Sequence, residues 1–96
     1  MHVLHMEHRV PDYDAWKQHG FDADPIGRKR MGVTGYRIGR GANDPNHVTI
    51  ELEFADAEAA TRMAEALTTM WVGAQARGLI ETPALTSFEV VESAEF

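Results

Sequence analysis

The chain has 96 residues, of which 44% are hydrophobic and 25% are charged, and these proportions are ordinary for a soluble globular domain. Nine basic and fifteen acidic residues give a net charge of −6, which argues against nucleic acid or an anionic membrane surface as a partner. Without cysteine, disulfides, thiolate catalysis and cysteine-ligated metals are excluded. No apolar run approaches the roughly 20 residues that span a bilayer, and no signal segment opens the chain. We therefore expect a single cytoplasmic domain over residues 1–96.

Residues 2–9 alternate in character and predict a first strand. Because successive side chains of a strand point to opposite faces, the strand sorts its polar residues into two sets. One face carries Leu4 and Met6 together with His2 and His8, and the other carries His5, Glu7 and Arg9.

Two helical signals follow the first strand. Asp12 is placed to cap a helix that runs to about Gly20, with Trp16 on its inner side. Asp24 precedes a proline, the order typical of a helix start, and predicts a second short helix that ends near Gly32.

The central part of the chain reads as a hairpin followed by a helix. Residues 33–40 and 47–54 predict two strands, and residues 41–46 are dense in turn formers. Asp56 is placed to cap a helix that continues, directly or as a second piece, to Gly78. Residues 86–92 predict the last strand.

The resulting order is βαββαβ, which describes an α+β, ferredoxin-like fold: a four-stranded antiparallel sheet with both helices on one face. Right-handed crossovers place the first and third strands at the centre. The predicted helix-facing side chains are Leu4, Met6, Tyr36, Ile38, Val48, Ile50, Leu52, Phe54, Phe88 and Val90.

The opening strand, the PDYDAW helix start, the NDPNHVTIELEF hairpin and strand, and the final FEVVE resemble the dimeric α+β barrel superfamily over nearly the whole chain. Its members include antibiotic-biosynthesis monooxygenases, small polyketide cyclases and muconolactone isomerases. The resemblance implies a homodimer whose open sheet faces form a barrel, with a ligand cavity between each sheet and its own helices. In the oxygenase branch the third strand often ends in tryptophan, whereas Phe54 stands here.

The helix-facing side supplies the candidate site. His8, at the end of a central strand, would carry a proton, and Tyr36 would position a ligand. An aromatic or polyketide-like small molecule would fit a pocket lined by Met6, Trp16, Met63 and Trp71, although residues at helical spacing are more often plain core. The chemistry would be cyclisation, isomerisation or oxygenation without an organic cofactor. A basic run, residues 27–30, would either face solvent or guide an anionic substrate.

Two other interpretations remain open. The chain would be a non-catalytic binding or interaction module if side chains fill the cavity. Alternatively, His5 and the glutamates of the two central strands would bind a divalent cation, although no local ligand spacing supports such a site. The interpretation of that polar face that needs no metal is an ion-paired dimer interface or a solvated surface.

Overall fold

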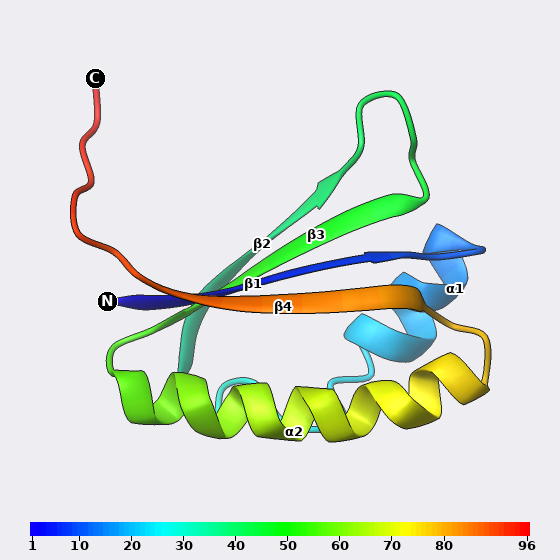
Figure 1. Ribbon diagram of the computed structural model, residues 1–96, viewed down its shortest axis with the longest axis horizontal. Coiled ribbons are helices and arrows are strands. Elements are labelled where there is room, and N and C mark those ends of the chain that lie inside the picture. The colour runs from blue at the N-terminus through cyan, green and yellow to red at the C-terminus, as the bar shows by residue number, and fades with distance from the viewer.

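The computed structural model describes all residues, Met1–Phe96. One antiparallel sheet in the order β2-β3-β1-β4 forms a layer, and the helical segments cover one of its faces (Figure 1). The ferredoxin-like prediction is confirmed, with the first and third strands at the centre. The strands are β1 (His2–Arg9), β2 (Val33–Arg40), β3 (His47–Phe54) and β4 (Glu81–Glu89).

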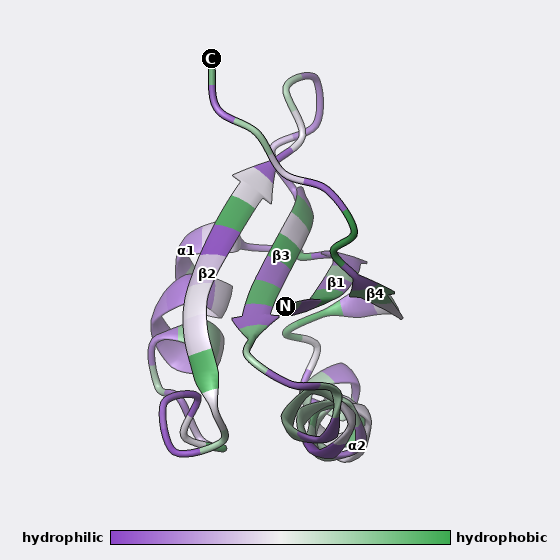
Figure 2. Ribbon diagram, turned by 90° about the vertical axis from the view of Figure 1, so that its left-hand side faces the viewer, coloured by the Kyte–Doolittle hydropathy of each residue, from purple (hydrophilic) through white to green (hydrophobic).

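Strand β3 shows most clearly why the sheet has two unlike faces. Its even-numbered side chains, Val48 to Phe54, are all buried, while its odd-numbered ones are only partly covered. The alternating bands of hydropathy along β3 are visible in Figure 2. Burying one side chain of every two removes a continuous apolar face from water, and this burial holds the sheet against the helices.

The long helix α2 (Ala57–Ala76) supplies the other half of the core. It begins where the Asp56 carboxylate accepts a hydrogen bond of 2.8 Å from the Ala59 backbone N–H, as the cap predicted. It runs unbroken beyond Met70 and ends before Gly78, whose φ of +72° suits glycine. Its buried stripe consists of Ala59, Ala60, Met63, Leu67, Trp71 and Ala74.

The first helical region has the predicted bounds, but its second half is wider than an α-helix. Asp12 caps α1 (Tyr13–Trp16), and the chain then opens into a π-helical turn, η1 (Lys17–Phe21). Gly20 lies in this turn against the Trp16 indole, where an added Cβ would come within 3.3 Å of the ring. A larger residue at position 20 would therefore crowd the Trp16 indole, and glycine leaves room for it.

The short helix expected between Asp24 and Gly32 does not form, so that prediction is wrong. The segment consists of turns and bends. Asp24, Gly27 and Gly32 adopt positive φ values of +48°, +84° and +94°. Three left-handed residues in so short a segment are incompatible with a right-handed helix, whatever the capping pattern suggests.

The last strand was also predicted wrongly, both in its bounds and in the face it presents. It starts at Glu81 rather than 86, ends at Glu89, and includes Pro83. Proline is tolerated because β4 is an edge strand. Pairing with β1 places Phe88 beside Val3 on the open face, where it is 51% exposed. Leu85, beside Met6, takes the inner position instead, and Val90 lies beyond the strand.

The core lies between the sheet and α2 with the α1–η1 region. It contains 15 buried hydrophobic residues, with Leu4, Val48 and Phe54 fully enclosed. No helix in the structure combines the length and apolar character that crossing a bilayer requires.

Candidate functional site

A cavity lies between the inner sheet face and the helical layer, where the fold resemblance implied one. Its volume is about 90 Å³. Residues of α1, η1 and α2 contribute to the lining, and the irregular segment after η1 forms one wall. The lining residues are Met6, His8, Trp16, His19, Gly20, Phe21, Asp24, Pro25, Ile26, Arg28, Ile50, Leu52, Met63, Leu67, Met70, Trp71, Ala74, Arg77, Leu79 and Ile80.

His8 is the only polar residue among the buried residues of the chain, with 4% of its surface exposed. Alternation along β1 turns its ring inward with Leu4 and Met6, and the ring meets the Trp16 indole edge to face at 5.3 Å between centroids. Its Nδ1 atom is buried and has no hydrogen-bond partner within the protein. A buried polar atom without a partner costs about 1–3 kcal/mol, so a ligand group that bonds to it would gain that energy.

Burial also decides the charge of His8. Desolvation lowers the pKa of its imidazole from 6.5 to about 4, because the charged form loses its hydration inside the protein. The sequence interpretation assumed an imidazole that titrates near neutrality. The structure instead gives a neutral imidazole at pH 7, which can accept or donate one hydrogen bond and acts as a weak base.

A bulge in β4 lies directly beside His8. Glu7 pairs with Ala84 and Arg9 with Glu81, so Thr82 and Pro83 together face His8. Thr82 has a φ of +49°, which is unusual for a β-branched residue. Bulges and strained residues of this kind occur preferentially beside functional sites.

The structure brings together most of the residues predicted for the site. His8 and all four predicted ligand-binding residues, Met6, Trp16, Met63 and Trp71, line the cavity. Tyr36 does not: it lies on the inner side of the edge strand β2, is 55% exposed, and packs against Phe21 with ring centroids 5.0 Å apart.

Sequence reasoning missed the charged residues of the cavity wall. His19, Arg28 and Arg77 line it, together with Asp24. The basic run at residues 27–30 was a signal for Arg28, but nothing in the sequence distinguishes Arg28 from its exposed neighbours Lys29 and Arg30. Arg77 follows the last turn of α2, and only the packing of that helix end brings it to the cavity.

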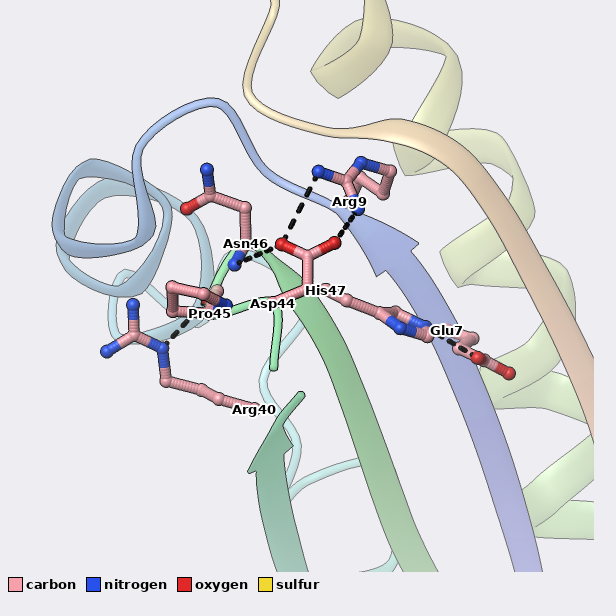
Figure 3. A network of polar contacts seen from close by, with 7 residues as sticks. All are labelled: Glu7, Arg9, Arg40, Asp44, Pro45, Asn46 and His47. Carbon is pink, nitrogen blue, oxygen red and sulfur yellow. Dashed lines mark hydrogen bonds and ion pairs between the residues drawn. The ribbon is translucent and has the colours of Figure 1, made fainter. Parts of the chain in front are cut away.

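The open sheet face carries a row of charged and polar side chains across the strands β1, β2 and β3. Glu7 bonds His47 at 2.6 Å, His5 lies 3.5 Å from Glu51, and Arg37 donates to Glu51 at 3.1 Å. Figure 3 shows the end of this row beside the hairpin loop, where Arg9 also pairs with Asp44. The hydrogen bond from Arg9 holds the pKa of the Asp44 carboxyl below its usual value.

A second hollow, of about 300 Å³, opens at this end of the face and is lined by Glu7, His8, Arg9, His47, Thr82 and Ala84. It is larger than the first but shallow and polar, whereas ligand pockets are mostly apolar and enclosed. No three histidine, aspartate or glutamate side chains are grouped so that they could hold a metal ion. The interpretation of His5 and the glutamates as a metal site therefore lacks its ligand set.

No protein-family model matches the chain, and no curated protein matches it. Solved structures do. A proposed antibiotic biosynthesis monooxygenase from Deinococcus radiodurans is 17% identical, with a TM-score of 0.73 over 100% of this chain and 98% of that one. A variant of SnoaB, a cofactor-independent oxygenase from Streptomyces nogalater, is 15% identical, with a TM-score of 0.72 over 96% of this chain and 94% of that one.

A third match is a dimeric ferredoxin-like protein from an uncultured marine organism, 8% identical, with a TM-score of 0.66 over the full length of both chains. The chain thus has the ferredoxin-like α+β fold of antibiotic biosynthesis monooxygenase-like proteins. The predicted resemblance is confirmed at the level of the fold.

Proposed function

We propose that this protein binds a small flat aromatic or polyketide-like molecule in the cavity between sheet and helices, as a homodimer, and that His8 bonds a polar group of the ligand. The observation that carries the proposal is His8 itself: its ring lines a mostly apolar cavity, and its buried Nδ1 lacks a protein partner. Cavities of this composition are the usual sites for small molecules.

The enzymatic form of the proposal is a cofactor-independent oxygenase, cyclase or isomerase. His8 would take a proton from a ligand hydroxyl, and the apolar surroundings would strengthen each remaining hydrogen bond. Because its pKa is about 4, His8 suits an acidic hydroxyl, such as an enol or phenol beside a carbonyl, better than a weakly acidic carbon. The likeness in fold to a cofactor-independent oxygenase supports this reaction class.

Binding without turnover is the second candidate, and the low pKa of His8 favours it, because this imidazole is a poor base. In either case the cavity of about 90 Å³ is smaller than ordinary ligand pockets of roughly 300–1,000 Å³. A ligand larger than one ring therefore needs the irregular wall between η1 and β2 to move outward.

The test is a titration with phenol, a single ring with an acidic hydroxyl, followed through the two indole N–H signals in the NMR spectrum. Trp16 and Trp71 are the only tryptophans, and both line the cavity, so each signal reports on it. We expect both signals to shift, and we expect His8→Gln and His8→Ala to weaken binding roughly tenfold through loss of one buried hydrogen bond.

His2→Gln is the matched control, because His2 lies on the same strand and does not line the cavity. It should leave the affinity unchanged. Equal affinity in wild type and both His8 variants would contradict the role of His8, and the absence of any indole shift would contradict the cavity as a binding site. Oxygen uptake with the bound phenol then separates turnover from binding alone.

A further inference from the structure

The wall of the cavity carries positive charge, which the proposed function does not use. Arg28 and Arg77 line it against a single carboxylate, Asp24. The chain as a whole has a net charge of −6, so this excess of positive charge runs against the general balance. A local basic site on an acidic protein concentrates the field at that site and attracts anions to it.

Arg28 is held in place by its neighbours rather than free in solvent. Its guanidinium lies 3.8 Å from the centroid of the Phe21 ring, and its Nη1 donates to the Phe21 carbonyl at 2.8 Å. The side chain is only 19% exposed. A guanidinium fixed by an aromatic face and a carbonyl has lost most of its freedom before a ligand arrives, so little entropy remains to be lost on binding.

The guanidinium nevertheless retains unused hydrogen-bonding capacity. Its Nη1 lies 3.5 Å from the Asp24 carboxylate, which already accepts from the Arg28 backbone N–H at 2.9 Å. No protein atom accepts a hydrogen bond from Nε or Nη2 of Arg28. These two atoms present the parallel donors that a carboxylate matches with both of its oxygens.

We infer that the ligand of this cavity is an aromatic carboxylic acid, whose ring occupies the apolar part beside Trp16 and Trp71 and whose carboxylate binds Arg28. The inference rests on the proposed function and adds the chemical class of the ligand. Arg77 adds positive charge to the cavity wall, and His8 meets a second polar group on the ring.

The experiment compares benzoate with benzamide, which has nearly the same shape and no charge, through the same two indole signals. We expect the acid to bind roughly tenfold more tightly than the amide, the effect of a charge-assisted bidentate contact. Added salt should weaken binding of the acid and leave binding of the amide unchanged.

Arg28→Met should remove the preference for the acid, and Lys29→Met should keep it. Both variants lose one positive charge from neighbouring positions, but Lys29 is exposed and does not line the cavity. If Arg28→Met fails to fold, Arg28→Lys, which keeps the charge without the planar fork, should show a reduced preference for the acid.

The outcomes separate the inference from the function on which it rests. Equal affinity for acid and amide in the wild type, or an unchanged preference in Arg28→Met or Arg28→Lys, overturns the inference and leaves the binding function standing. Loss of the preference in Lys29→Met as well also overturns the inference, because general charge would then explain it. If neither compound shifts an indole signal, the proposed function fails and the inference with it.

Discussion

At the scale of single residues, His8 is the side chain that ties the core to the candidate site. Strand parity turns it toward the helices, and Trp16 covers it. The same burial that lowers its pKa to about 4 leaves its Nδ1 without a partner. A buried polar atom without a partner lowers the stability of the fold. The ligand proposed above would supply the contact that His8 lacks.

The low pKa of His8 predicts how stability depends on pH. In the unfolded chain the imidazole has a pKa near 6.5, so it binds a proton below that pH. In the folded protein the same imidazole stays neutral down to about pH 4. Unfolding therefore takes up a proton in this window, and the free energy of unfolding falls as the pH drops from 6.5 to 4. The His8 contribution amounts to roughly 3 kcal/mol when fully expressed.

Urea unfolding at pH 7 and pH 4.5 measures this loss. Other groups titrate in the same range, so the relevant quantity is the difference between wild type and His8→Gln. The variant should lose about 2 kcal/mol less than the wild type between the two pH values. Identical losses in the two proteins would show that His8 is not buried in its neutral form.

At the scale of elements, the strand β4 and its bulge shape the wall beside His8. The bulge gives Thr82 a left-handed backbone, and a β-branched side chain tolerates that conformation poorly. The strain persists because the pairing of β4 with β1 on both sides of the bulge leaves no alternative register.

Replacing Thr82 with glycine should relieve this strain and stabilise the protein by about 1 kcal/mol. Thr86→Gly is the control, since Thr86 lies in the same strand, is also exposed, and has a negative φ. There glycine should destabilise by up to about 1 kcal/mol through the entropy it adds to the unfolded chain. Urea unfolding checks both, and equal destabilisation would contradict the strain at Thr82.

At the scale of the whole molecule, the open sheet face is the surface that a second copy would cover. It combines the row of paired charges with Val3 and Phe88, which lie side by side on β1 and β4. The face is opposite to the helices, so two copies can join there without closing either cavity.

We therefore predict a particle of twice the 10.7 kDa chain mass in size-exclusion chromatography with light scattering. Phe88→Glu should shift it to the monomer, because a buried, unpaired charge on the interface is costly. Val72→Glu is the control, because Val72 is an even more exposed apolar residue on the helix α2, at 70% against 51% for Phe88. A monomeric wild type, or a dimer that survives Phe88→Glu, would contradict an interface on the sheet.

Some of this protein could be predicted from sequence because the signals are local. Alternation over residues 47–54 defines a strand and its buried face, and Asp56 marks a helix start through a contact that spans three residues. The same parity placed His8 inside and His5 outside. Met6, Trp16, Met63 and Trp71 were found by periodicity, since core and cavity wall share one face.

Other features depended on contacts between distant segments, which no local pattern encodes. The register of β4 against β1 decided that Phe88 faces outward and Leu85 inward, and an edge position made Pro83 acceptable there. Three left-handed residues replaced the expected helix after Asp24. Only the tertiary structure brought Arg28 and Arg77 to the cavity wall and buried His8 deeply enough to keep it neutral, because desolvation and proximity arise from packing.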